Sequence, residues 1–147
     1  MAKNLNVEEL IGYQLKKTQH ALRMQMDDVL KTLDLTTPQY SVLAQLEVEG
    51  GLSNAELARR SFITAQTMHG IVSNLEIRGL IKRKGASQHG RILCTELTDR
   101  GYEVVILAHK MIQAVEKRML YTVSDDQKLL LEKLLMECFD NLNVNVK

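Results

Sequence analysis

The sequence lacks tryptophan, and only 4% of its 147 residues are aromatic. So few aromatic side chains make a β-sandwich core improbable. The chain also has a single proline and eight glycines, which leaves little material for long loops or Pro-rich linkers. A chain of this length fits one domain. We therefore expect a mainly α-helical single domain.

The two cysteines, Cys94 and Cys138, are too few for a disulfide framework or a cysteine zinc site. We interpret both as small buried apolar side chains. No secretory signal follows Met1, and no apolar run approaches the roughly 18 residues of a membrane span. A cytoplasmic location away from the membrane is therefore expected.

Residues for catalysis or metal binding do not occur in any familiar pattern. The four histidines show no helical ligand spacing, and no nucleophile motif, phosphate loop or carboxylate pair is present. We expect no enzymatic activity, no metal and no cofactor.

Positive charge is concentrated in the middle of the chain. Residues 53–100 hold eight basic and four acidic side chains, whereas residues 1–52 hold five and seven, and residues 101–147 hold six and seven. A basic segment in an otherwise neutral protein is typical of a nucleic-acid interface, although solvated basic faces are also common.

Two helices are predicted before this basic segment. Apolar residues at spacings of three and four indicate one helix over residues 7–33. Thr37 is the expected cap of the next helix, with Pro38 at its first position, and Tyr40, Val42, Leu43 and Leu46 form its inner face.

Residues 53–78 have the pattern of a helix-turn-helix. Ser53 and Glu56 form a capping box for a helix to about Arg60, and Thr64 caps a second helix that ends before Gly79. The second helix should bury Met68, Ile71, Val72 and Leu75. Its outward side chains suit contacts in the major groove. We predict that DNA is contacted by Thr64, Gln66, Thr67, His69, Gly70, Ser73 and Asn74.

Glutamine and asparagine can pair with adenine through two hydrogen bonds, and Gly70 permits close approach of the backbone. We interpret Arg59 and Arg60 as a solvated face. A protein-docking role for the same motif remains an alternative.

A basic β-hairpin is predicted after the helix-turn-helix. The strand candidates are residues 80–84 and 91–97, joined by a polar turn. Such a wing can lie over minor-groove phosphates, with Arg91 entering the groove. The predicted wing contacts are Lys82, Arg83, Lys84, Ser87, Gln88, His89 and Arg91.

The last two predicted helices are residues 98–121 and 125–143, with Thr98 and Ser124 as their caps. Both helices carry too many apolar side chains for packing on one side only. A second copy of the chain would cover them, and the alternative is a four-helix core within one chain. We expect residues 1–33 and 101–147 to be dimerisation helices around a DNA-binding lobe formed by residues 34–100.

The sequence resembles the MarR family over essentially the whole chain. The segments that carry the resemblance are residues 35–43, 52–58, 75–83 and 97–101, together with Arg91. The resemblance implies a winged helix-turn-helix homodimer that binds a pseudo-palindromic double-stranded operator. It also implies that a small ligand or an oxidant releases the DNA, which usually relieves repression. Our candidate ligand is a small phenolic or other aromatic compound, although a regulator without a ligand remains an alternative.

One position departs from the family pattern. His89 stands two residues before Arg91, where the family usually has an acidic residue. We expect His89 to approach a phosphate when protonated, so that operator affinity depends on pH between about 5.5 and 7.5.

A ligand pocket is expected at the junction between the DNA-binding lobe and the dimerisation helices. Candidate lining residues are Tyr13, His20, Met24 and Tyr40. Ordinary packing is the alternative for each of them.

Overall fold

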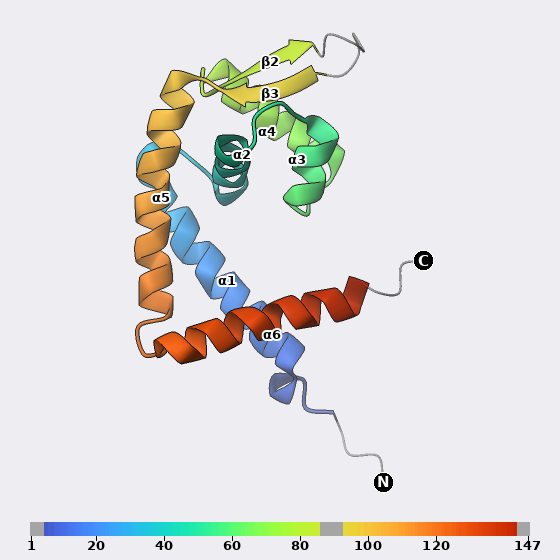
Figure 1. The fold of residues 1–147 in the computed structure, drawn as a ribbon, viewed down its shortest axis with the longest axis vertical. Helices are drawn as coiled ribbons and strands as arrows, with labels where there is room; N and C mark the ends of the chain where they lie inside the picture. Colours follow the sequence, from blue (N-terminus) through green and yellow to red (C-terminus); the bar gives the residue numbers. More distant parts are fainter. Residues whose placement is uncertain (1–4, 86–92, 144–147) are drawn as a thin grey trace. The chain divides into compact units, whose positions relative to one another are not determined.

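The computed structural model describes residues 5–85 and 93–143. The elements in chain order are η1 Val7–Glu9, α1 Ile11–Leu30, η2 Lys31–Leu33, α2 Thr37–Val48, β1 Leu52–Ser53, α3 Asn54–Arg60, α4 Ala65–Ile77, β2 Ile81–Gly85, β3 Leu93–Leu97, α5 Asp99–Met119 and α6 Asp125–Asn143 (Figure 1). The prediction of a mainly helical chain with a small β-hairpin is confirmed.

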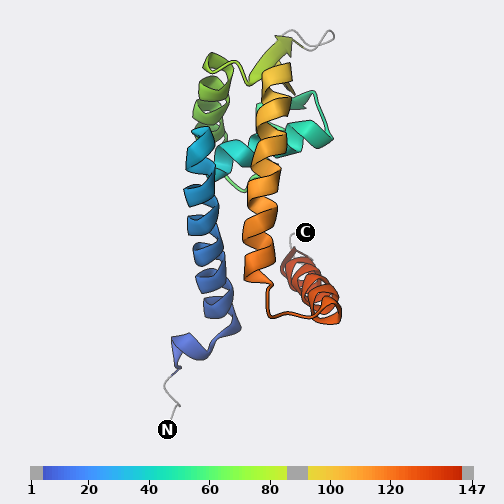
Figure 2. The ribbon, with the colours of Figure 1, turned by 90° about the vertical axis from the view of Figure 1, so that its left-hand side faces the viewer.

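The chain divides into two compact units, one ending at Val115 and one beginning at Glu116. In the first unit, α2, α3, α4 and the sheet form a lobe, and α1 and α5 extend away from it (Figure 2). The core of this lobe includes Leu43, Leu57, Met68, Leu75 and Ile81, each at most 2% exposed. The core therefore fixes the helix-turn-helix to the sheet.

The region predicted as one helix over residues 7–33 is helical but interrupted. Short 3-10 turns, η1 and η2, flank α1, because Leu10 has extended backbone angles and Asp34 takes a left-handed conformation with a φ of 52°. The prediction of one continuous helix is wrong at both ends, and apolar periodicity cannot separate a 3-10 turn from an α-helix of the same phase.

The cap of α2 is Thr36 and not the predicted Thr37. The Thr36 hydroxyl accepts from the backbone N–H of Gln39, while Thr37 and Pro38 occupy the first two helical positions. The Thr37 hydroxyl donates instead to Oδ1 of Asp27, 2.6 Å away on α1. Asp27 therefore shifts the start of the helix by one residue.

The sheet has a strand that the sequence analysis missed. Among the described residues its order is β1-β3-β2, and both pairs are antiparallel. In β1, Leu52 pairs with Thr95 and Ser53 pairs with Cys94. Two residues are too short for an alternating pattern, so only the pairing with β3 defines this strand.

In the second unit, α6 buries none of its described side chains within this one chain. Ser124 forms the predicted capping box with Gln127, through hydrogen bonds of 2.9 and 3.3 Å. The large apolar side chains exposed on α6 are Leu129, Leu130, Leu131, Leu134, Leu135, Met136, Phe139 and Leu142. An apolar surface of this extent is typical of a site that a partner covers.

Candidate nucleic-acid interface

The first helix of the motif is held by reciprocal hydrogen bonds at its start. The backbone N–H of Ser53 donates to Glu56 Oε2 at 2.7 Å, and the backbone N–H of Glu56 donates to the Ser53 hydroxyl at 3.2 Å. The backbone hydrogen bond from Ser53 is the main reason that the pKa of Glu56 lies below its ordinary value. The predicted capping box is confirmed, and it fixes where α3 begins.

The turn between the two helices reverses the chain through a left-handed residue. Phe62 has a φ of 55°, and the backbone N–H of Ile63 donates to the Ala58 carbonyl at 3.1 Å. The Thr64 hydroxyl then accepts from the backbone N–H of Thr67 at 3.1 Å. Thr64 is thus the cap of α4, as predicted, and the first turn of α4 contains no carboxylate.

The two faces of α4 differ as expected. Met68, Val72 and Leu75 are buried, and Ile71 packs against them partly buried. The predicted contact residues Gln66, Thr67, His69, Gly70 and Asn74 are exposed, and Ser73 is half-buried. The structure therefore brings the predicted residues of this helix onto one outward polar surface, which suits the major groove.

The basic residues of β2 separate onto two faces, because successive side chains of a strand alternate. Lys82 and Lys84 are exposed and lie 4.0 and 3.3 Å from Glu96 on β3. Arg83 lies on the opposite face and donates two hydrogen bonds, of 2.7 and 3.0 Å, to Glu76 of α4.

The hydrogen bonds to Glu76 raise the pKa of Arg83, and those from Arg83 lower the pKa of Glu76. Arg83 was predicted as a phosphate contact, and the structure gives it an intramolecular partner. Its bidentate pair fixes the wing strand to the recognition helix.

The remaining wing predictions lie outside the described residues. These are Ser87, Gln88, His89 and Arg91. Their contacts with DNA, and the pH dependence expected from His89, stay predictions.

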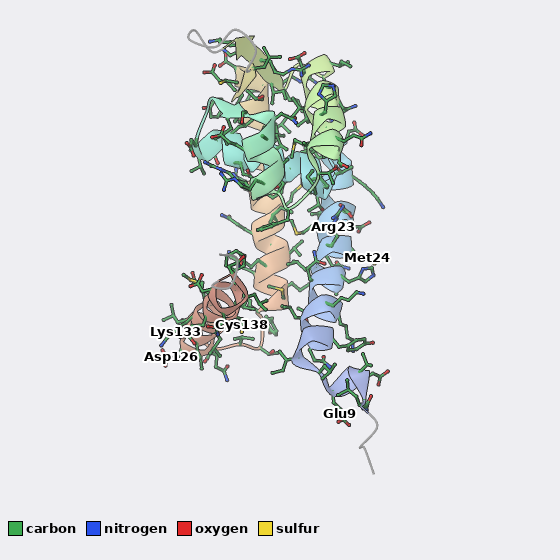
Figure 3. All side chains as sticks on the ribbon, turned by 90° about the vertical axis from the view of Figure 1, so that its right-hand side faces the viewer. Glu9, Arg23, Met24, Asp126, Lys133 and Cys138 are labelled. Carbon is green, nitrogen blue, oxygen red and sulfur yellow. The ribbon has the colours of Figure 1, made fainter. Side chains whose placement is uncertain are left out.

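A cavity of about 470 Å³ lies between α1, α2 and the end of α3. Its lining residues are Met26, Thr37, Tyr40, Ser41, Ala44, Gln45, Val48 and Arg60. Of the four residues predicted to line a pocket, Tyr40 lines this one. Tyr13 and His20 are exposed on α1 and do not line it. The same holds for Met24 (Figure 3). Apolar periodicity does not indicate which side of α1 faces a cavity.

Two polar groups of this cavity were missed by the sequence analysis. The Arg60 side chain, interpreted there as solvated, lines the cavity and binds Glu49 at 2.7 Å. The Oε1 atom of Gln45 is buried and has no hydrogen-bond partner in the described residues. The Arg60 guanidinium beside apolar walls can hold a small aromatic acid.

Tyr40 also connects this cavity to α5. Its hydroxyl lies 2.8 Å from His109 Nδ1, and His109 Nε2 lies 2.8 Å from a carboxylate oxygen of Glu47. Because the carboxylate only accepts, a neutral His109 donates from Nε2 and accepts from Tyr40 at Nδ1. The chain of hydrogen bonds joins α2 to α5.

Neither cysteine is fully buried. Cys94 is half-buried on β3, and Cys138 is exposed on α6 (Figure 3). The prediction of burial is wrong for Cys138, because α6 buries no side chain in this one chain.

Residues 5–85 and 93–143 contain neither a candidate metal site nor a helix that could cross a membrane. No group of three side chains could hold a metal ion. In the same residues, none of the helices combines the length and apolarity that a membrane crossing requires.

Comparison with known proteins identifies the family. Residues 33–92 match the model of the MarR family. The chain is 34% identical to the HTH-type transcriptional repressor Rv2887 of Mycobacterium tuberculosis over 128 residues, which are 84% of this chain and 92% of that protein.

Solved structures agree with this match. The Rv2887 structure in complex with salicylic acid is 30% identical, with a TM-score of 0.74 over 91% of this chain and 99% of that one. The repressor CouR, bound to a 23-mer DNA duplex, is 27% identical, with a TM-score of 0.84 over 94% of this chain and 98% of that one. The chain belongs to the MarR family of winged helix-turn-helix transcription regulators.

Proposed function

We propose that this chain is a homodimeric repressor that binds a pseudo-palindromic operator and is released by a small aromatic acid. The observation that carries the proposal is the outward polar surface of α4, and the strand β2 that follows this helix carries two further exposed basic side chains, Lys82 and Lys84. Base contacts from such a helix supply sequence preference, and lysine–phosphate contacts supply affinity. We also propose that the protein acts in the cytoplasm and has no catalytic role, as befits a transcription regulator.

Dimerisation is supported by the apolar surface of the terminal helices. Leu129 is 67% exposed and Leu142 is 81% exposed on α6, and Ile11 is 84% exposed on α1. A second copy would cover these side chains and hold two recognition helices at a fixed distance. Helix-turn-helix dimers place their half-sites about one helical turn apart, so the dimer would account for a pseudo-palindromic operator.

DNA binding is tested by fluorescence anisotropy with the DNA upstream of the chain's own gene, over a salt series. Each phosphate contact contributes about 0.9 to the slope of log affinity against log salt. Lys84→Ala should lower the slope by about one, whereas Lys133→Ala, which removes the same charge from α6, should leave it unchanged (Figure 3). Binding without salt dependence, or no binding, would favour the protein-interaction alternative.

Ligand release is tested with salicylate as the probe. We expect salicylate to weaken operator binding by the wild type, because Arg60 can exchange the Glu49 carboxylate for that of the ligand. Arg60→Ala should abolish this effect. The neighbouring Arg59→Ala removes an exposed arginine that does not line the cavity, and it should respond like the wild type. Equal release of both variants would contradict the assignment of the cavity, and no release of the wild type would favour a regulator without this ligand.

A further inference from the structure

The side chain of Gln39 has an orientation that its surroundings determine. It closes the capping box of α2, where Oε1 accepts from the backbone N–H of Thr36 at 3.0 Å. A backbone N–H can only donate, so the amide atom of Gln39 that faces it must be the oxygen. The amide nitrogen Nε2 therefore lies on the other side, away from the cap.

That nitrogen contacts the recognition helix. Gln39 Nε2 donates to Oδ1 of Asn74 at 3.0 Å, which joins α2 to α4. Because Nε2 has only hydrogens to offer, Asn74 must turn its oxygen toward Gln39. The Asn74 amide nitrogen then points to the exposed side, and no acceptor among the described residues takes a hydrogen bond from it.

We propose that Asn74 contacts the operator only as a hydrogen-bond donor, and that Gln39 thereby sets the preferred base at this position as guanine. The inference rests on the proposed function, and it names a specificity-determining pair within the same surface. An unconstrained asparagine pairs with adenine by donating to N7 and accepting from N6. Here Oδ1 is turned toward Gln39 on α2, so the group left to face the operator is the donating NH₂.

The acceptors that each base presents in the major groove then decide which base Asn74 prefers. Guanine presents two neighbouring acceptors, O6 and N7, in the major groove to an amide NH₂ group, whereas adenine presents only N7 and thymine only O4. Cytosine presents the N4 amino group, which also donates, so it offers Asn74 no partner. We expect the wild type to select guanine at one position in each half-site and to exclude cytosine there.

The Gln39→Glu variant tests this assignment while it keeps the cap. Glutamate is a standard residue at this position of a capping box, so Thr36 retains its acceptor. The carboxylate has no hydrogen to donate, so Asn74 must donate to it and turn Oδ1 outward. The preferred base should change from guanine to cytosine, and the cytosine-to-guanine ratio should rise by about tenfold or more.

The measurement is selection from a library of randomised duplexes followed by sequencing, with the full-length chain. Comparing base frequencies at each position cancels the uniform loss of affinity that an added negative charge causes. Asn74→Ala should lose the preference at that position alone, and Gln39→Glu should have no base-specific effect in the Asn74→Ala background.

Two failures are distinguishable. A wild type that enriches no sequence would overturn the proposed function, and this inference with it. A wild type that enriches an operator, with the same base profile in Gln39→Glu and Asn74→Ala, would overturn the assignment of Asn74 alone. Selection of adenine over guanine at this position by the wild type would overturn it as well, since adenine offers a donor only the single acceptor N7.

Discussion

Gly70 lies inside α4, where a glycine is unfavourable unless something requires it. Apart from its chain neighbours and the backbone of its own helix, no atom of the described residues lies within 4 Å of the position that a Cβ would occupy, and the backbone is helical. Packing within the chain therefore does not require glycine here. A glycine inside a helix costs about 0.5–1 kcal/mol relative to alanine. Gly70→Ala should stabilise the protein by that amount, which raises the melting temperature by roughly 1–4 °C.

The same substitution should weaken operator binding. If the outward face of α4 enters the major groove, the added methyl group occupies space where backbone and DNA meet. Overpacking of a close contact costs about 1–3 kcal/mol, so a Kd increase of roughly tenfold is expected. A variant that is more stable and binds more weakly separates a functional glycine from a structural one.

Melting curves at one protein concentration and anisotropy titrations with the operator measure the two effects. Gly12→Ala is the matched control, because it makes the same change inside α1, where no described atom lies within 4 Å of the Cβ position either. It should leave the Kd unchanged. If Gly70→Ala melted at a higher temperature with an unchanged Kd, this part of α4 would not approach DNA closely. A lower melting temperature would refute the reasoning about packing.

Three further predictions concern stability and assembly. Gly101→Ala should lower the melting temperature, because the added Cβ would lie 2.0 Å from the carbonyl oxygen of Leu80. We expect the free energy of unfolding to fall by about 2 kcal/mol or more, and an unchanged melting curve would contradict this. Stability to urea should fall in acid as Asp27 becomes protonated. Burial raises the pKa of Asp27, but the hydrogen bonds from Thr37 and the hydrogen bond and charge of Arg23 together outweigh it and hold the pKa below the ordinary 3.8. The stability from this carboxylate is present above pH 3.8 and is lost as the pH falls through the lower folded value. Asp27→Asn should flatten this acid dependence, and an equally steep loss in the variant would refute its origin. Leu134→Glu should convert the dimer to a monomer in size-exclusion chromatography, because it places a charge on the exposed apolar surface of α6. An unchanged elution volume would exclude that surface from the dimer interface.

The features that could be predicted from the sequence are those that depend on neighbouring residues. The capping box of Ser53 and Glu56, the cap at Thr64 and the left-handed Gly79 each involve residues within a few positions of one another. The apolar spacing of α4 likewise identified its buried face. These local rules were sufficient to place the helix-turn-helix and its outward surface.

The features that could not be predicted depend on contacts between distant parts of the chain. Thr36 replaces Thr37 as a cap because Asp27, on another helix, engages Thr37. Arg83 pairs with Glu76 rather than facing solvent, and Arg60 lines a cavity, because the fold brings α3, α4 and β2 against their neighbours. Charge counts identify a basic segment, but they do not show which of its side chains already have partners.

The recognition helix is held by polar contacts on three sides, and this restricts how a ligand can release DNA. Asn74 binds Gln39 of α2, Glu76 binds Arg83 of β2, and Arg78 donates to the Asp34 carbonyl at 2.7 Å. These contacts tie the C-terminal end of α4 to α2, to β2 and to Asp34, so we expect α4 to move together with its lobe. A ligand in the cavity beside α1 and α2 would therefore act by changing the distance between the two lobes of a dimer. Operator binding is sensitive to that distance, because two recognition helices must reach half-sites about one helical turn apart.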